Sequence, residues 1–288
     1  MSNSDSAFLI GKSHKVCEDY AIHKDPEKSG SYVIVCDGCS SSQNSDFAAR
    51  LLAHAAEKWI DDGNSKVFDG IEFEKRSITT AVMCSKVLGE DKFPIDATLL
   101  TAIVKDNKIR LRAAGDGVFI LGRNDGGFDI YVIEFPRGYP CYPSYLMNSD
   151  GYAELVRYFK EKYNDSGYSI EVNKYLFKDN KLSIDEECSG TGLILDGEPW
   201  DLSFAKDIDN SAKVYNQVLI TTDGLLSFSD YSFTVPLETI FSLLLQFKGF
   251  KGEYVSRRLN KFVKDCAAKG WWHFDDLTLA GIYFGEDS

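Results

Sequence analysis

Two short apolar runs in this sequence each end on an Asp-Gly pair. Tyr32 to Cys36 is followed by Asp37-Gly38, and Val218 to Thr222 is followed by Asp223-Gly224. Both runs are rich in β-branched residues, which is typical of buried strands. A carboxylate at the end of a buried strand can hold a hard cation, and a neighbouring glycine lets the ion approach a backbone carbonyl. Two strands that end in this way predict one acidic centre supplied from both.

The Asp37-Gly38 pair also suits a type I′ hairpin turn, which Asp-Gly sequences favour. A hairpin needs a second strand directly after the turn, and the segment from Cys39 to Asp46 carries no strand pattern. We therefore prefer a strand that ends on a metal ligand, and the hairpin remains the alternative interpretation.

Three further acidic positions stand beside predicted strands or turns: Glu18-Asp19, Asp116 within Gly-Asp-Gly, and Asp275-Asp276. Taken singly, each is typical of a solvated turn residue. Taken together they suit Mg²⁺ or Mn²⁺, which take carboxylate and water ligands. One Asp that bridges two ions, with other carboxylates on either side, builds a centre that activates a water. The sequence predicts such a centre only if folding brings these residues together.

The bulk composition limits the class of protein and of partner. The 288 residues suffice for one large domain or two ordinary ones, with 44% hydrophobic and 26% charged residues. A net charge of −12 argues against a broad nucleic-acid surface, because phosphates would be repelled. A single phosphorylated side chain remains compatible if metal ions mask the carboxylates. No apolar run has the length of a membrane span, and Met1 to Ser6 lacks a signal-peptide pattern, so no membrane partner is expected.

The seven cysteines are scattered, and their count is odd. This usage predicts reduced, buried thiols in a cytoplasmic protein rather than a disulfide framework. Cys36 and Cys39 form a C-x-x-C pair, but no second pair has zinc-ligand spacing. A redox or zinc site is therefore disfavoured.

Apolar periodicity predicts clusters of strands and helices rather than βαβ units, which disfavours a doubly wound parallel sheet. The predicted strands are 8–11, 20–24, 32–36, 98–104, 109–114, 117–122, 128–133, 168–177, 200–204, 218–222 and 277–284. The predicted helices are 44–59, 73–88, 153–163, 236–247 and 253–269. Turn residues between the four strands in 98–133 predict one antiparallel meander.

No residue pattern forces a domain boundary, so a single domain over 1–288 is expected. The span of about 135–211 is the least regular, and we expect an irregular insertion of the kind that carries lids or specificity loops. Within it, the aromatic stretch from Tyr139 to Tyr145 fits either the lining of a cleft or ordinary packing.

In their order along the chain, the acidic motifs resemble those of the metal-dependent protein phosphatases, the type 2C serine/threonine phosphatases. The motifs are Glu18-Asp19, Asp37-Gly38, Asp96-Ala97-Thr98, Gly115-Asp116-Gly117, Asp223-Gly224 and Asp275-Asp276-Leu277-Thr278. Each motif is short, but their shared order and spacing over 11–284 make the set fairly specific. Ser13-His14 and Cys17-Glu18-Asp19 are similar to the opening of a bacterial branch of the family.

The resemblance implies an α+β fold, a four-layer αββα sandwich of two antiparallel sheets flanked by helices. It implies that Asp37 bridges two Mg²⁺ or Mn²⁺ ions and that Gly38 gives its carbonyl to one of them. The remaining implied ligands are carboxylates: Asp223, Asp275, Glu18 and Asp19 for the two ions, and Asp116 with Asp223 for a third ion found in some members. The implied substrate is a phosphorylated protein, with a cognate serine/threonine kinase as a candidate partner.

The sequence departs from the family pattern at several positions. His14 stands where the family has a phosphate-binding Arg, and we take it as the candidate for that role in substrate binding and catalysis. Cys39 stands where some members have His, and Asp276 replaces a common Asn. The segment 96–99, Asp-Ala-Thr-Leu, replaces a Ser-Gly-(Ser/Thr)-Thr motif.

The leading hypothesis is a Mg²⁺- or Mn²⁺-dependent phosphoprotein phosphatase that hydrolyses phosphoserine and phosphothreonine through a water activated by two metal ions. No covalent intermediate is needed, so no Ser or Cys nucleophile is required. An aspartyl-phosphate phosphatase would need an acid at Cys39 and is disfavoured. The alternative is a catalytically weak or inactive phosphoprotein-binding module on the same fold. The missing Arg favours this alternative, and the retained acids, which are costly to keep together without a cation, oppose it.

Overall fold

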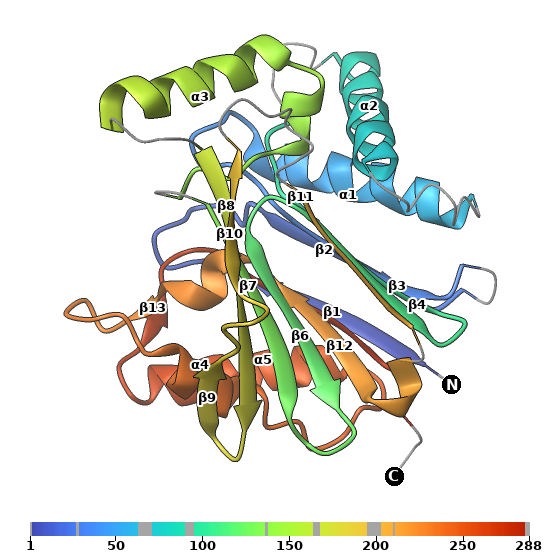
Figure 1. The fold of residues 1–288 in the computed structure, drawn as a ribbon, viewed down its shortest axis with the longest axis vertical. Helices are drawn as coiled ribbons and strands as arrows, with labels where there is room; N and C mark the ends of the chain where they lie inside the picture. The colour runs from blue at the N-terminus through green and yellow to red at the C-terminus, as the bar shows by residue number, and fades with distance from the viewer. Residues whose placement is uncertain are drawn as a thin grey trace.

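The computed structural model describes residues 2–26, 29–62, 71–89, 95–135, 138–163, 168–194, 203–209 and 211–285. Its strands form two large antiparallel sheets (Figure 1). The order in the eight-stranded sheet is β1 (Asn3–Leu9), β15 (Leu277–Tyr283), β12 (Tyr215–Thr221), β6 (Gly117–Arg123), β7 (Phe128–Glu134), β8 (Tyr168–Lys178) and β10 (Gly190–Ile194), with β9 (Lys181–Ile184) also paired to β8. The order in the five-stranded sheet is β11 (Ser203–Asp209), β5 (Lys108–Ala114), β4 (Leu99–Lys105), β3 (Ser31–Asp37) and β2 (Asp19–Lys24). A short pair, β13 (Phe228–Ser229) and β14 (Trp272–His273), lies apart from both.

Helices cover the outer faces of both sheets (Figure 1). The helices α1 (Ser45–Asp61) and α2 (Glu72–Val87) share a buried cluster with the five-stranded sheet. The helices α4 (Leu237–Leu244) and α5 (Tyr254–Ala267) share another with the eight-stranded sheet. A third cluster lies between the sheets, and Tyr152 of α3 (Ser149–Tyr163) belongs to it. The expected four-layer αββα sandwich is confirmed.

The alternation of side chains along β3 shows why this strand is buried on both faces. Tyr32, Ile34 and Cys36 pack towards α1 and α2. Val33 and Val35 belong to the cluster between the two sheets. Because side chains in a strand point alternately to opposite faces, a strand covered on both sides must be apolar throughout. The unbroken apolar run that precedes Asp37 follows from this position, and the strand ends at Asp37 without a hairpin.

The predicted meander over 98–133 is wrong. The strands β4 and β5 form a hairpin in one sheet, and β6 and β7 form a hairpin in the other. The Gly115-Asp116-Gly117 turn carries the chain from one sheet to the other instead of closing a hairpin. Gly115 and Gly117 have φ values of 106° and 140°, which side chains rarely tolerate. Glycine at these positions indicated a sharp turn, but it gave no information on which strand comes next in space.

The span expected to be an irregular insertion contains regular elements in its described residues. A 3₁₀ turn, Pro143–Leu146, leads into α3, and β8, β9 and β10 extend the eight-stranded sheet. The strand β11 forms an edge of the five-stranded sheet and begins at Ser203, while 200–202 of the predicted strand lie outside the described residues. The first strand is Asn3–Leu9 rather than 8–11, because it pairs along β15 from Tyr283 to Leu277.

All seven cysteines are free thiols, as predicted. Cys36, Cys141 and Cys266 are buried, whereas Cys84 and Cys188 are exposed, so the prediction of burial is wrong for these two. No helix in the described ranges is long and apolar enough to cross a membrane.

Candidate metal centre

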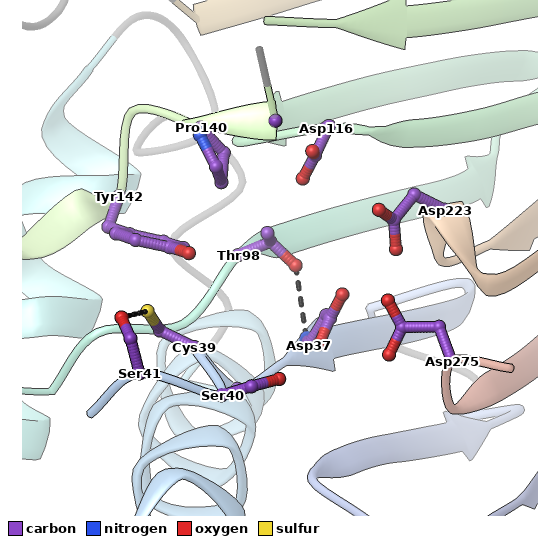
Figure 2. Close-up of a pocket in the computed structure, with 12 residues that line it drawn as sticks. Asp37, Cys39, Ser40, Ser41, Thr98, Asp116, Pro140, Tyr142, Asp223 and Asp275 are labelled. Atoms are coloured by element: carbon purple, nitrogen blue, oxygen red, sulfur yellow. Dashed lines mark hydrogen bonds between the residues drawn. The ribbon is translucent and has the colours of Figure 1, made fainter. Parts of the chain in front are cut away.

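Four aspartates from four separate connections face one cavity of about 220 Å³ (Figure 2). Asp37 ends β3 of the five-stranded sheet, and Asp116 lies in the turn between the two sheets. Asp223 follows β12 by two residues, and Asp275 lies between β14 and β15. We call these four residues the carboxylate wall. Strand ends of both sheets therefore supply it, as the two Asp-Gly pairs suggested.

The backbone around these aspartates is held by contacts between distant segments. The Asp37 amide donates to Thr98 Oγ1 at 3.0 Å, and the Thr98 amide donates to the Asp37 carbonyl at 2.8 Å. Gly224 lies so close to the opposite loop that a Cβ atom built on it would be 1.8 Å from the carbonyl oxygen of Asp276. Only glycine allows this approach, which keeps Asp223 close to the Asp275-Asp276 loop.

Burial and mutual repulsion raise the pKa values of the carboxylate wall. Burial raises the pKa of Asp37 well above its ordinary value, and the charges of Asp19, Asp223 and others add to the shift. Burial and then Asp275 raise the pKa of Asp223 to about 6. The pKa values of Asp116 and Asp275 are raised as well, with burial as the largest cause. These shifts show that the charged wall is unfavourable by itself and would be stabilised by positive charge.

Asp19 lies behind the wall and is fully buried. It pairs with Asp37 across β2 and β3 and accepts a hydrogen bond from Thr222 Oγ1 at 2.9 Å. Burial raises the pKa of Asp19 to about 7 even though its hydrogen bonds oppose the shift. Its Oδ1 atom and the Oδ1 atom of Asp223 are buried and have no hydrogen-bond partner in the described part of the chain. A bound cation would satisfy these two buried carboxylate oxygens.

Asp276 joins the N-terminal loop to the loop before β15. Its Oδ1 accepts the Gly11 amide at 2.6 Å, and its Oδ2 accepts the Glu18 amide at 2.5 Å. The His14 Nδ1 atom lies 3.0 Å from Asp276 Oδ2, and the His14 Nε2 atom lies 3.3 Å from Asp275 Oδ1. Three potential ligand atoms of His14, Glu18 and Asp276 lie within 4.8 Å of one another. Because both Asp276 carboxylate oxygens already accept backbone amides, this carboxylate connects the N-terminal loop to the loop before β15.

The other side of the cavity carries neutral groups. Cys39, Ser40 and Ser41 follow the Asp37 strand, and Tyr142 enters from the segment 138–146 with its hydroxyl directed into the cavity (Figure 2). We call these four residues the neutral wall. Among the described residues that line the cavity, none is Lys, Arg or His. The sequence alone allows either cleft lining or packing for Tyr142, and it assigns no role to Ser40 and Ser41.

The comparisons with known proteins identify the family of the chain. A sequence profile described as Protein phosphatase 2C matches residues 11–264. The chain belongs to the protein phosphatase 2C family. The protein is therefore a member of the protein phosphatase class of enzymes. A search of curated protein sequences gave no match.

Solved structures of bacterial phosphatases share the fold of this family member. The serine/threonine phosphatase Stp1 from Staphylococcus aureus superposes with a TM-score of 0.54 at 13% identity, over 99% of this chain and 96% of that one. The Mycobacterium tuberculosis serine/threonine phosphatase PstP/Ppp gives a TM-score of 0.52 at 12% identity, over 99% of both chains. The S. agalactiae serine/threonine phosphatase gives 0.52 at 13% identity, over 99% of this chain and 100% of that one. The narrower resemblance of the opening motif to a bacterial branch stays a prediction.

The residues of this phosphatase fit the divalent cations on which the family depends. Asp37, Asp116, Asp223 and Asp275 present hard oxygen donors to one cavity, and Gly38 lines the same cavity. Mg²⁺ and Mn²⁺ prefer such oxygen ligands, and the raised pKa values indicate a wall that needs positive charge. The predicted ligands Glu18 and Asp19 lie outside the cavity lining: Ser45 donates to the Glu18 carboxylate, and Asp19 is behind Asp37. His14 lies with Glu18 and the Asp275-Asp276 loop, also outside that lining.

Proposed function

We propose that the protein is a Mn²⁺- or Mg²⁺-dependent phosphatase that hydrolyses phosphoserine and phosphothreonine in proteins. The observation that carries this proposal is the carboxylate wall, in which four aspartates from both sheets face one cavity of a protein phosphatase 2C chain. An open acidic cavity accepts a dianionic phosphate ester only if cations lie between the two.

The ligand set that we propose for two ions is Asp37, the Gly38 carbonyl, Asp223, Asp275 and Glu18, with Asp19 beside them and Asp116 for a third ion. When bound, divalent ions supply the positive charge that neutralises phosphoryl oxygens and activates a water for in-line attack on phosphorus. The chain itself holds the ligands in place. Thr98 fixes the Asp37 backbone, and Thr222 fixes the Asp19 carboxylate that lies behind it.

The proposal needs no covalent intermediate. Cys39, Ser40 and Ser41 line the cavity, but in this mechanism they form no bond to phosphorus. A phosphorylated protein is the proposed substrate, and a serine/threonine kinase that supplies the phosphate group is the proposed partner. We also propose that the chain acts as a single phosphatase domain in the cytoplasm.

The test is turnover of an aryl phosphate and of a phosphothreonine peptide by the purified protein with Mn²⁺ or Mg²⁺. We expect activity with either ion, complete loss with a chelator, and recovery when the ion is returned. Activity that survives full chelation would exclude the two-metal mechanism. Binding of Mn²⁺ and phosphopeptide without any turnover would instead establish the alternative, a phosphoprotein-binding module on the same fold.

A further inference from the structure

The proposed reaction assigns no role to the neutral wall. This wall faces the carboxylate wall across a cavity of about 220 Å³. A phosphate group held between the two walls would have cations on one side and Tyr142, Cys39, Ser40 and Ser41 on the other (Figure 2). These side chains carry hydroxyl and thiol hydrogens, and such donors form strong hydrogen bonds to ionised phosphate oxygens.

We propose that the Tyr142 hydroxyl and the loop of Cys39, Ser40 and Ser41 recognise the substrate phosphate in place of a basic side chain, and that Asp96 holds these two segments together. This inference rests on the proposed function, because it assigns the residues that bind the phosphate in that reaction. It names a phosphate monoester dianion as the ligand of the neutral wall and Asp96 as a positioning residue.

The segment that carries Tyr142 is rigid where it enters the cavity. Pro140 lines the cavity, and Pro143 begins a 3₁₀ turn directly after Tyr142. A proline restricts the preceding residue to extended backbone, and Tyr142 has φ −73° and ψ 149°. Its ring centroid lies 6.0 Å from that of Tyr145, which lies 6.3 Å from that of Tyr152 in α3. The Tyr142 hydroxyl is thus presented with little conformational freedom, which favours binding.

Asp96 joins the two parts of the neutral wall. Ser42 Oγ donates to its Oδ2 atom at 3.0 Å, and Ser144 Oγ donates to its Oδ1 atom at 2.6 Å. The Asp96 carbonyl also accepts the Cys39 amide at 2.9 Å. One residue therefore connects the loop after β3 to the segment of Tyr142, more than a hundred residues away by sequence. Cys39 Sγ and Ser41 Oγ lie 3.1 Å apart, which orders the tip of the loop.

Neutral donors suit this cavity because the charge of the phosphate is already balanced on the opposite side. Burial raises the pKa of the Tyr142 hydroxyl further above its ordinary value near 10, so this group is a neutral donor near pH 7. The hydroxyl therefore donates to phosphate without forming an ion pair with the aspartates. A nearby guanidinium would compete with the metal ions for those carboxylates.

The experiment measures the affinity of the Mn²⁺-loaded protein for inorganic phosphate by calorimetry, so its readout does not depend on turnover. We expect Tyr142→Phe to weaken phosphate binding about tenfold or more, as for the loss of one hydrogen bond to a charged group, with Mn²⁺ affinity unchanged. In turnover assays the same variant should raise KM for the phosphopeptide more than it lowers kcat. Tyr139→Phe removes the same hydroxyl from the same segment, outside the cavity lining, and should have no effect.

The role of Asp96 is tested through coupling. Ser144→Ala removes one of the two hydrogen bonds that the Asp96 carboxylate accepts among the described residues, and it should weaken phosphate binding in the wild-type background. In the Tyr142→Phe background it should have little further effect, because the hydroxyl that it positions is gone. Equal losses in both backgrounds would show that Ser144 and Asp96 do not act through Tyr142 and would overturn this part of the inference.

Other outcomes separate this inference from the proposed function. If Tyr142→Phe binds phosphate as the wild type does, the inference is wrong even when the protein is an active phosphatase. If phosphate binds and depends on Tyr142 but no phosphopeptide is hydrolysed, the inference holds and the proposed function fails. Arg137 is next to Gly138 in the sequence and lies outside the described residues. A loss of phosphate binding in Arg137→Ala, with none in Tyr142→Phe, would assign recognition to a cation instead.

Discussion

The two walls of the cavity are built in opposite ways. The carboxylate wall is made of residues at strand ends, so its geometry follows from the pairing of two large sheets. The neutral wall is made of a loop and a 3₁₀ segment that meet through the side chain of Asp96. Strand ends are held by many backbone hydrogen bonds, whereas in the described part of the chain the loop and the 3₁₀ segment are connected mainly through side chains, among them the two bonds to the Asp96 carboxylate. The difference suggests that substitutions in the carboxylate wall affect chemistry and those in the neutral wall affect recognition.

The largest expected effect is that of Asp37→Asn. This change keeps the shape of the side chain but removes a carboxylate whose charge interacts with those of Asp223, Asp275 and Asp116. We expect Mn²⁺ affinity to fall strongly and kcat/KM to fall by about two orders of magnitude or more. Asp223→Asn and Asp275→Asn should behave similarly, and Asp116→Asn should be milder. Asp207→Asn, at an exposed ion pair with Arg110, is the matched control and should retain full activity.

A wild-type rate for Asp37→Asn, with an unchanged circular dichroism spectrum, would show that the carboxylate wall does not hold the catalytic metal ions. The stability of the same variant adds an independent readout. Because the substitution removes a buried charge among other carboxylates, the metal-free variant should unfold at a higher temperature than the metal-free wild type at pH 7.

The second expected effect is a loss of stability of the metal-free protein as pH rises. The pKa values of Asp223 and Asp19 in the folded state are about 6 and about 7, above the unfolded value of about 3.9. Between these limits the folded protein binds more protons than the unfolded chain. The contribution of these groups to the free energy of unfolding is therefore greatest below about pH 4. It decreases as pH rises to about 7, by at most about 1.4 kcal/mol per pH unit for each carboxyl.

The measurement is the melting temperature between about pH 5 and 8 with a chelator and with excess Mn²⁺, a range that spans the raised carboxyl pKa values. We expect Mn²⁺ to raise the melting temperature more at the upper end than at the lower end, because the ion then binds ionised carboxylates. Asp223→Asn should reduce the slope of the metal-free curve. A metal-free curve that rises with pH across this interval would contradict the electrostatic account of the carboxylate wall. Tyr142→Phe should leave both curves unchanged.

The same contrast explains how much the sequence could predict. Asp37 and Asp223 were predictable because a buried strand leaves a local pattern of apolar residues and the acid directly follows it. It was not predictable that the chain passes from one sheet to the other at Asp116, because glycines with positive φ indicate a turn and do not identify the next pairing partner. Tyr142 and Asp96 were missed as a pair because their connection runs through Ser144, and no local pattern marks a contact between residues 48 positions apart. Pro140 and Pro143, which flank Cys141-Tyr142, were the local sign that the backbone of this segment is restricted.

The smallest expected effect concerns His14, which the sequence predicts as the phosphate-binding group. Burial opposes its charged form, but the hydrogen bond to Asp276 and the charges of Asp276, Asp275 and Glu18 raise its pKa above the ordinary value. His14 contacts Asp275 of the carboxylate wall as well as Glu18 and Asp276 outside it, so we expect it to balance the charge of these carboxylates. His14→Gln should then weaken phosphate binding less than Tyr142→Phe does, and it should change Mn²⁺ affinity through Asp275.

The pH dependence of kcat/KM separates these two roles of His14. If the imidazolium holds phosphate, kcat/KM should fall on the alkaline side at a pH above the ordinary His value of about 6.5, and His14→Arg should remove this fall because an Arg stays charged. If His14 only balances Asp275 and Asp276, the wild type and His14→Arg should differ in the Mn²⁺ concentration that they require and not in the shape of the profile at saturating Mn²⁺. An alkaline fall that disappears in His14→Arg, together with a loss of phosphate binding in His14→Gln as large as that in Tyr142→Phe, would place a cation in phosphate recognition. Recognition would then be shared between the two sides of the cavity, and the division between a catalytic wall and a recognition wall would not hold.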